Sequence, residues 1–279
     1  MKAGLMKLHV LDLGRLRSDP NGLVGGSVMP TRSQPKRTLE LATIPCSAYC
    51  IEHADGNILY DLGCHPQAMG PDGRWSEFLQ EIVPYDGDEE CQLPNRLAQI
   101  GLWPDDIRYA VLSHLHNDHS GCVEFFRKTQ LIVHRHEFQG AFESFGLRRE
   151  QSPYVLRDLA VWASRDLNWR LVEPEEGDMV LADGVELLNL GAGHSFGMLG
   201  LHVQLPGTGS VLLVSDAIYG AANYERPVRL PGFMTDAAGY RRTVERIRQI
   251  AQRCQGQVWF GHDMQQFETL RKSTEGWYE

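Results

Sequence analysis

The densest group of possible metal ligands lies in one short segment, which is HLHNDH from residue 114 to 119. Three histidines and one aspartate fall within these six residues, in a chain with 11 histidines among 279 residues. Neutral imidazole and carboxylate groups are good ligands for zinc and similar ions. In an extended backbone His114 and His116 point to the same side and can share an ion, whereas Asp118 and His119 are expected to begin a helix and face a neighbouring position. The spacing predicts two adjacent metal sites, against the alternative of a polar loop with exposed histidines.

Three more ligand-type residues follow apolar stretches later in the chain. His194 lies in GAGHSFG after a strand candidate, Asp216 ends SVLLVSD, and His262 ends QVWFGHD. Side chains at the carboxyl ends of strands converge in α/β folds. Each of the three could alone be a packed core or loop residue, but together with the first segment they make seven ligands. We therefore expect a metal centre that both halves of the chain build.

The elements that must position these residues alternate between strands and helices. In the first half, apolar and β-branched runs predict strands at 47–53, 57–63, 108–114 and 130–137, with a helix starting at 118–126. In the second half, strands are expected within 179–191, 199–205, 209–217 and 257–263, and an amphipathic helix over 236–254 with its apolar stripe at Val244, Ile247 and Ala251. This pattern predicts one α/β domain over 1–279, with two β-sheets packed face to face, helices outside and an insertion at 65–107.

Composition and charge narrow the range of partners. The 36 acidic residues outnumber the 27 basic ones, for a formal charge of -9, and no block of like charge stands out. Nucleic acid and anionic membrane surfaces are poor partners for such a chain, because binding either needs clustered Lys and Arg. The first 16 residues lack a signal-peptide core, and no apolar run is long enough to span a bilayer. We expect a cytoplasmic protein that acts on a small molecule.

The whole pattern of ligands resembles the metallo-β-lactamase superfamily, with Asp61 in ILYDLG matching an early strand-end aspartate of that family. The resemblance implies an αββα sandwich with two divalent metal ions, zinc by default, between the sheets. The first ion would be held by His114, His116 and His194, and the second by Asp118, His119 and His262. Asp216 would bridge both ions, and Asp61 would steady the histidine loop.

Within that superfamily the sequence is similar to the N-acyl-homoserine lactonases. Tyr219 stands three residues after Asp216, as in those enzymes, and the segment from 261 to the end is also similar. Asn117 and Met198 depart from residues common in that branch. The resemblance implies lactone opening by a hydroxide that bridges the ions, with Tyr219 bonded to the substrate oxygen and Asp118 passing the proton to the leaving alkoxide. The alternatives are another small lactone, of the 4-pyridoxolactone or γ-butyrolactone type, a glyoxalase-II-like thioesterase, and a non-enzymatic metal-binding protein.

Two segments are expected to flank the mouth of the site, 22–29 and 221–231. Their apolar members are predicted to line a substrate pocket; these are Leu23, Val24, Met29 and Tyr224. The insertion at 65–107 is a candidate contact for a homodimer.

Overall fold

Two β-sheets form the centre of this computed structural model, which describes residues 6–279 and leaves residues 1–5 of the amino-terminal segment outside the described part. The first sheet has seven strands, in the spatial order β4 (Tyr85–Asp86), β1 (Lys7–Ser18), β2 (Ala42–Glu52), β3 (Asn57–Tyr60), β5 (Ile107–Val111), β6 (Gln130–His134) and β7 (Trp169–Val172). The second has five, in the order β12 (Gln257–Phe260), β11 (Gly209–Ser215), β10 (Met198–Leu205), β9 (Val185–Gly191) and β8 (Met179–Ala182). Both are mixed sheets, since β3, β5, β6 and β7 pair in parallel, as do β11 and β12.

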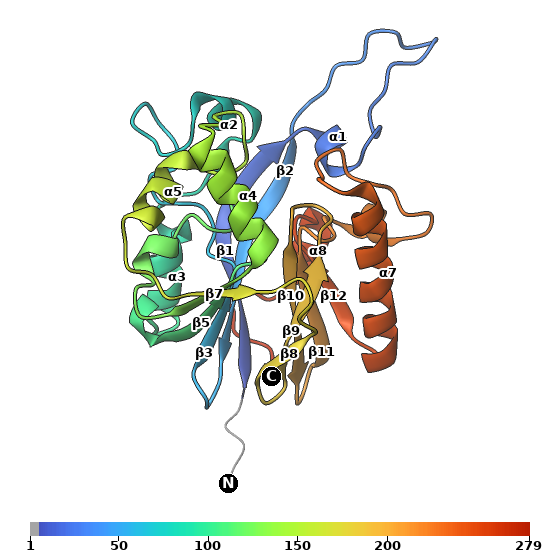
Figure 1. The fold of residues 1–279 in the computed structure, drawn as a ribbon. Helices are drawn as coiled ribbons and strands as arrows, with labels where there is room; N and C mark the ends of the chain where they lie inside the picture. Colours follow the sequence, from blue (N-terminus) through green and yellow to red (C-terminus); the bar gives the residue numbers. More distant parts are fainter. Residues whose placement is uncertain (1–5) are drawn as a thin grey trace.

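Helices cover the outer faces of both sheets (Figure 1). The α-helices are α1 (Pro20–Leu23), α2 (Glu77–Ile82), α3 (Leu93–Gln99), α4 (Arg135–Gly146), α5 (Leu156–Ala163), α6 (Ala221–Tyr224), α7 (Ala237–Cys254) and α8 (Met264–Thr269). Three short 3-10 helices complete the elements: η1 (Glu89–Cys91), η2 (Pro104–Asp106) and η3 (Val123–Phe125). In Figure 1 α3, α4 and α5 lie on one side of the molecule and α7 on the other. No helix among residues 6–279 is both long and apolar enough to cross a bilayer.

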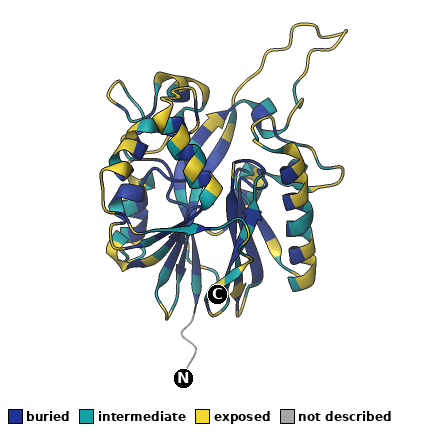
Figure 2. Cartoon of the chain, in the orientation of Figure 1, coloured by how far each residue is buried: buried dark blue, intermediate teal, exposed yellow. Residues whose placement is uncertain are grey.

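Three layers of buried side chains hold this arrangement together, and the alternation along each strand explains them. In β5 Ala110 faces the helices outside while Val111 faces the second sheet. In β11 Leu213 faces the first sheet while Leu212 faces α7. Successive side chains of a strand point to opposite faces, so each sheet buries both of its faces (Figure 2). The architecture is the predicted αββα sandwich, and the expected α/β class is confirmed.

The helix α7 shows how local sequence sets one of these layers. Val244, Ile247 and Ala251 lie on one face and are buried against the second sheet, as predicted. The side chain of Asp236 accepts a hydrogen bond from the Ala238 N–H at 2.9 Å and caps the amino end. Gln255 ends the helix in a left-handed conformation, with φ 52°.

The prediction of a helix starting at 118–126 is wrong. The segment forms turns followed by η3, because some of its backbone groups bond to the chain that follows β3 and its internal hydrogen bonds, such as that from the Val123 N–H to the Ser120 carbonyl, close only short turns. The Leu62 N–H donates to the His119 carbonyl at 2.8 Å, and the Gly121 N–H donates to the Gly63 carbonyl at 2.8 Å. A Cβ at Gly121 would lie 2.1 Å from the backbone nitrogen of His65, so only glycine allows this approach.

The segment 65–107 packs against the first sheet and its helical layer. It supplies the edge strand β4, which pairs with β1, and its Leu93 and Leu97 are buried in the outer core. Its origin as an insertion stays a prediction. A second long connection, from 24 to 41, projects away from the body of the molecule as the loop at the upper right of Figure 1.

Candidate metal centre and substrate cavity

The ends of four strands meet at one place between the sheets. Asp61 follows β3, and the segment 113–119 follows β5, which runs parallel to β3. Asp216 follows β11, and His262 follows β12, which runs parallel to β11. Parallel neighbours present their carboxyl ends at the same edge, so each sheet delivers its polar residues to the same end of the molecule. His194 joins them from the connection between β9 and β10.

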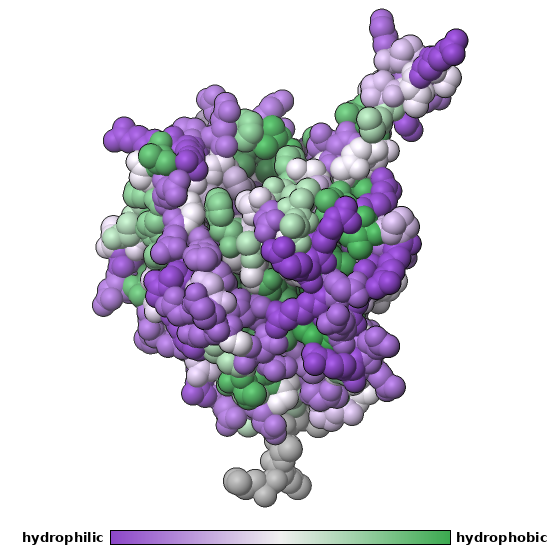
Figure 3. Space-filling model, turned by 45° about the vertical axis from the view of Figure 1, so that its right-hand side comes forward, coloured by the Kyte–Doolittle hydropathy of each residue, from purple (hydrophilic) through white to green (hydrophobic). Residues whose placement is uncertain are grey.

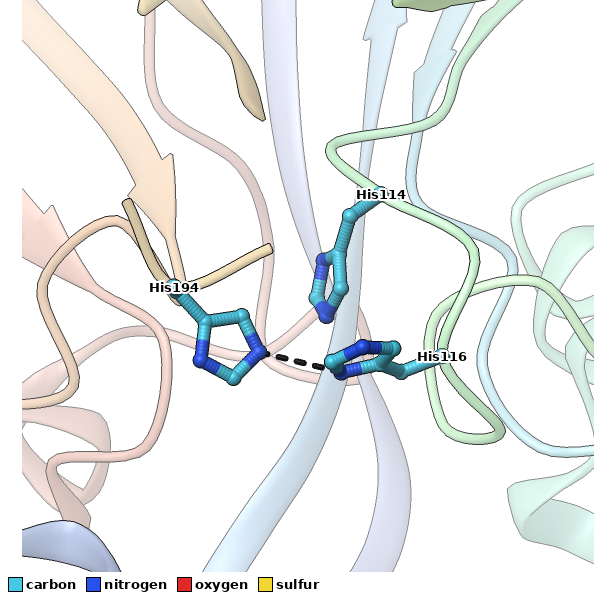
Figure 4. A group of neighbouring side chains, drawn as sticks. All are labelled: His114, His116 and His194. Carbon is cyan, nitrogen blue, oxygen red and sulfur yellow. Dashed lines mark hydrogen bonds between the residues drawn. The ribbon is translucent and has the colours of Figure 1, made fainter. Parts of the chain in front are cut away.

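Three imidazoles form the first half of the site. His114, His116 and His194 each offer one ring nitrogen, and these atoms lie within 4.8 Å of one another. Figure 4 shows the three rings converging from two separate loops, with the Nε2 of His194 3.0 Å from the Nδ1 of His116. His114 is completely buried and His194 nearly so. Such a trio matches the nitrogen ligand set of a zinc site with further positions open.

The second half of the site combines a carboxylate with two imidazoles. Oδ2 of Asp118 lies 3.4 Å from Nε2 of His119 and 3.4 Å from Nε2 of His262. All three side chains are buried. Their ligand atoms also lie within 4.8 Å of one another. The turn at 117–120 therefore brings Asp118 and His119 to a position beside the first trio, as the spacing predicted, although no helix is involved.

Asp216 lies between the two halves and directs one oxygen to each. Oδ2 is 3.3 Å from Nε2 of His194 and 3.8 Å from Nε2 of His114. Oδ1 is 3.0 Å from Nε2 of His262 and 3.3 Å from Nε2 of His119. The geometry suits a carboxylate shared between two cations.

Several of these buried atoms have no hydrogen-bond partner among residues 6–279. They are Nε2 of His114, Nε2 of His119 and Oδ1 of Asp216. Buried polar atoms are nearly always paired, since leaving one unsatisfied costs about 1–3 kcal/mol. Atoms of this type, aimed at common points, fit divalent cations. The structure thus brings together all seven predicted ligands, while their binding of metal stays a prediction.

The two halves differ in their electrostatics. Burial, together with the neighbouring imidazoles, holds the pKa values of His114 and His116 well below the usual value, and burial also lowers the pKa of His194. Burial acts in the same direction on His262, but the carboxylates of Asp216 and Asp118 outweigh it and raise the pKa of His262 to about 9. The pKa of His119 is likewise raised well above its usual value by Asp118 and Asp216, against the effect of burial.

Asp61 ties the histidine loop to both sheets. Its carboxylate accepts hydrogen bonds from the Ser113 N–H at 2.7 Å, from the Ser113 and Ser215 hydroxyls at 2.9 Å each, and lies 2.9 Å from Nδ1 of His119. The residue has a positive φ of 61°, a conformation that Asp tolerates better than most residues. This geometry agrees with the supporting role that the resemblance implied for Asp61.

A cavity of about 290 Å³ opens above the site. Its floor is polar and contains residues of both halves, His116, His194, Asp118, Asp216 and His262. Its wall is largely apolar and comprises Leu23, Ile44, Phe78, Leu79, Ile82, Val83 and Phe233. Phe78, Ile82 and Phe233 are among the exposed large hydrophobic side chains, and Figure 3 shows apolar surface at this upper end, beside the base of the projecting loop. The cavity suits a ligand with a polar group at one end and an apolar tail.

The predicted pocket residues are only partly correct. Leu23 lines the cavity, but Val24, Met29 and Tyr224 do not. Met29 lies in the projecting loop and is 60% exposed. Tyr224 instead packs against Phe260 and Arg248 on the α7 side. The wall supplied by α2 was not predicted from the sequence, although residues 77–83 carry an amphipathic pattern that could have indicated it.

Tyr219 reaches the site from the turn after β11. It is 6% exposed, it lines the cavity, and its hydroxyl lies 3.1 Å from Nδ1 of His194. Burial raises the pKa of the phenol well above its usual value, so the hydroxyl stays protonated at neutral pH. Nε2 of His194 faces the other ligands, which leaves Nδ1 to carry the ring proton. That N–H donates to the Phe233 carbonyl at 3.2 Å and to the Tyr219 oxygen, which can still donate its own O–H into the cavity.

Comparisons with known proteins agree with this geometry. The family model of the metallo-β-lactamase superfamily matches residues 42–253. The N-acyl homoserine lactonase AiiB of Agrobacterium fabrum is 50% identical over 273 residues, which cover 98% of this chain and 99% of the relative. The N-acyl homoserine lactonase AiiA of Bacillus thuringiensis subsp. kurstaki is 30% identical over 266 residues, covering 95% and 96%.

Solved structures show the same similarity over the full length. A mutant of B. thuringiensis AiiA with N-decanoyl-L-homoserine bound at the active site has a TM-score of 0.81 at 28% identity and covers 100% of both chains. An N-acyl homoserine lactone hydrolase with the product N-hexanoyl-L-homoserine at its catalytic metal centre has the same TM-score, identity and coverage. The chain therefore belongs to the metallo-β-lactamase superfamily, and within it is similar to the N-acyl homoserine lactonases.

Proposed function

We propose that this chain is a metal-dependent hydrolase that opens the lactone ring of N-acyl homoserine lactones, an activity that quenches quorum sensing. The observation that carries the proposal is the position of Asp216, with one oxygen toward each of two ligand trios on the floor of an apolar cavity. Relatives that align over nearly the whole chain are named for this activity, which supports the choice of substrate.

The proposed cofactors are two divalent ions, with zinc as the expected species because the ligands are nitrogen and oxygen atoms. One ion would be held by His114, His116 and His194. The other would be held by Asp118, His119 and His262, and Asp216 would contribute to both sites. Bound ions at these positions supply Lewis-acid polarisation of a carbonyl and lower the pKa of a bound water toward neutrality.

Tyr219 is proposed to bind the oxygen of the lactone carbonyl. Its hydroxyl is protonated, lines the cavity and is held by His194. As the carbonyl carbon becomes tetrahedral its oxygen gains negative charge, and a donor already in place stabilises that charge without reorganisation. Tyr219 is thus expected to contribute to the rate more than to substrate affinity.

Asp118 is proposed to move the proton. Burial raises the pKa of this carboxyl, but His119 and His262 outweigh that effect and lower it, so Asp118 is ionised at neutral pH. It lines the cavity and can accept a proton from the attacking water. When the bond between the carbonyl carbon and the ring oxygen breaks, the same proton neutralises the leaving alkoxide.

The cavity wall favours an acyl homoserine lactone over a glutathione thioester. An apolar acyl tail fits a wall that includes Phe78, Ile82 and Phe233. A glutathione moiety carries carboxylates that need cationic partners, and none of the described residues that line the cavity is Lys or Arg. This observation separates the lactonase from the thioesterase alternative.

A substrate panel tests the proposal directly. The metal-loaded protein is assayed with N-acyl homoserine lactones of different chain lengths, with simple γ-lactones and with acyl-glutathione thioesters, before and after treatment with a chelator. We expect chelator-sensitive opening of the acyl homoserine lactones. Cleavage of thioesters alone would reject the lactonase, and cleavage of none of these substrates would favour a metal-binding protein without this activity.

The Tyr219→Phe variant tests the proposed role of the hydroxyl. Loss of one donor to a developing oxyanion costs about 100-fold in kcat, whereas KM and bound metal should change little. Tyr240→Phe is a matched control, because Tyr240 is also buried and lies outside the residues that line the cavity. Equal kcat values for Tyr219→Phe and the wild type would show that the hydroxyl has no role in catalysis and that Tyr219 serves only in packing.

A further inference from the structure

A buried carboxylate lies behind the histidine loop and takes no part in the proposed chemistry. Glu137 is in the first turn of α4 and is completely buried. Within the described residues 6–279 it forms no ion pair, although an unpaired buried charge is costly. The amino end of a helix favours a carboxylate in its first turn, but this effect alone is too small to compensate burial. The hydrogen bonds of Glu137 are therefore what accounts for a buried carboxylate at this position.

The two oxygens of Glu137 bind two different loops. Oε1 accepts a hydrogen bond from the Leu115 N–H at 2.9 Å, and Oε2 accepts one from the Ser195 hydroxyl. The hydroxyl of Tyr154 lies 3.1 Å from the Ser195 oxygen and can donate to it, since the Ser195 proton is directed at Glu137. The Tyr154 ring also contacts His116 edge-on, with ring centroids 5.1 Å apart.

The two residues that Glu137 binds, Leu115 and Ser195, are next to metal-ligand candidates in the sequence. Leu115 stands between His114 and His116, and Ser195 directly follows His194. One carboxylate thus joins the two loops that carry the three imidazoles of the first trio. Fixing both loops from behind would set the distance between His116 and His194, whose ring nitrogens lie 3.0 Å apart.

We propose that Glu137 is a positioning residue that holds His114, His116 and His194 in metal-binding geometry by bonding the Leu115 amide and the Ser195 hydroxyl. The inference rests on the proposed function for the identity of the three ligands. Glu137 is not among the residues that line the substrate cavity, and within the described part of the chain its hydrogen bonds go to Leu115 and Ser195 rather than to a ligand side chain. Residues outside the ligand shell that orient the ligands typically change metal affinity about 10- to 100-fold when mutated.

The test compares Glu137→Gln with a control on the same helix. Glu137→Gln keeps the size of the side chain and an acceptor for Leu115 but places an amide donor or a weaker neutral acceptor against Ser195. The control is Ala141→Gly, one turn later in α4, which is buried and loosens the helix without touching either loop. Both proteins are stripped of metal, and binding of Zn²⁺ is measured by competition with a chromophoric chelator. The absorption spectrum of the Co²⁺ form reports the geometry of the ligands.

We expect one Zn²⁺ to bind about 10- to 100-fold more weakly to Glu137→Gln, with an altered Co²⁺ spectrum, while Ala141→Gly lowers the unfolding temperature and binds metal as the wild type does. Unchanged affinity and spectrum in Glu137→Gln would overturn the proposal. If Glu137→Gln does not fold, Ser195→Ala removes the Oε2 contact together with the contact between Ser195 and Tyr154, and wild-type metal binding in that variant would overturn the proposal equally.

These measurements use no substrate, so they are separate from the test of the proposed function. A wild-type protein that binds two ions but opens no lactone would reject the lactonase and leave the role of Glu137 to be decided by the metal affinities. A protein that opens lactones but whose metal affinity does not depend on Glu137 would support the lactonase and reject the role proposed for Glu137.

Discussion

The two halves of the metal centre use similar ligands in opposite electrostatic surroundings. In the half formed by His114, His116 and His194 the imidazoles lie beside one another, two of them buried and His116 half-buried, and their pKa values are lowered. In the other half His119 and His262 are buried but face Asp118 and Asp216, and their pKa values are raised. Neutral imidazole is the form that binds a metal ion. The first half is therefore ready to bind, whereas the second must first release protons.

The carboxylates that support the two halves, Glu137 and Asp61, also differ in how they act. Glu137 reaches the first trio through a backbone amide and a serine hydroxyl, so it acts on the position of the loops. Asp61 lies 2.9 Å from Nδ1 of His119, so it contacts a ligand ring directly as well as the loop. A carboxylate on the far nitrogen of a histidine orients the ring and makes its other nitrogen a stronger ligand. One centre thus combines a half whose loops are held in position with a half whose ligands are tuned by neighbouring charges.

Replacing Asp216, the one residue common to both halves, should have the largest effect. In Asp216→Ala both trios lose their shared carboxylate, and only Asp118 is left to offset the positive charge that two ions would bring into one buried site. We expect lactone hydrolysis to fall at least about 1000-fold, because Lewis-acid activation contributes several kcal/mol. Hydrolysis rates and metal content by atomic emission, measured on the same sample, check this result.

Asp105→Ala is the matched control for that substitution. Asp105 is exposed, and its ion pair with Lys128 is of a kind that contributes little to stability. Its activity and metal content should equal those of the wild type. An Asp216→Ala protein that retains two ions and most of its activity would show that the two halves are independent.

The sequence predicted the centre better than its surroundings, for a physical reason. Ligands such as His114 and Asp216 stand directly after apolar strands, and the ends of strands are fixed by a regular pattern. The contacts of Glu137 depend on the packing of α4 behind the histidine loop, which has no periodic signal in the sequence. The same holds for Met29, since nothing in a loop rich in Gly and Pro reveals that it projects away from the cavity.

The wrong helix at 118–126 has a related explanation. Local propensity in that segment is overridden by its hydrogen bonds to residues 62 and 63, which lie more than fifty positions earlier in the chain. The amphipathic stripe of α7 involves no such competition, because its apolar face packs on one sheet only. Patterns local to one element and ligands at strand ends were predicted, whereas hydrogen bonds between irregular segments far apart in the chain were not.

The Asp61→Asn substitution should have an intermediate effect that is largest at the second half, where Asp61 contacts the His119 ring directly. Asn tolerates the positive φ at this position, so the backbone should be kept. The neutral amide is a weaker acceptor for His119 and cannot replace all four contacts of the carboxylate. We expect one of two Zn²⁺ ions to bind about 10- to 100-fold more weakly.

Combining this variant with Glu137→Gln sharpens the comparison. If the two supports act on different halves, the double variant should lose affinity at both ions, with changes in binding free energy that add. Competition titrations of the wild type, both single variants and the double variant measure this. Loss at the same ion in both single variants would contradict the division into two separately supported halves.

The smallest of these effects concerns pH and follows from the raised pKa of His262. In the metal-free protein this ring keeps its proton up to a pH of about 9, so an ion that binds the second half must displace it. Because the pKa of His119 is raised as well, affinity there should fall at least about tenfold for each pH unit below 9. The first half should show no such slope between pH 7 and 9, because the pKa values of its histidines are lowered and no proton has to leave. Calorimetric titration in buffers of different ionisation enthalpy counts the protons released with each ion, and equal release at both ions would contradict the contrast between the two halves.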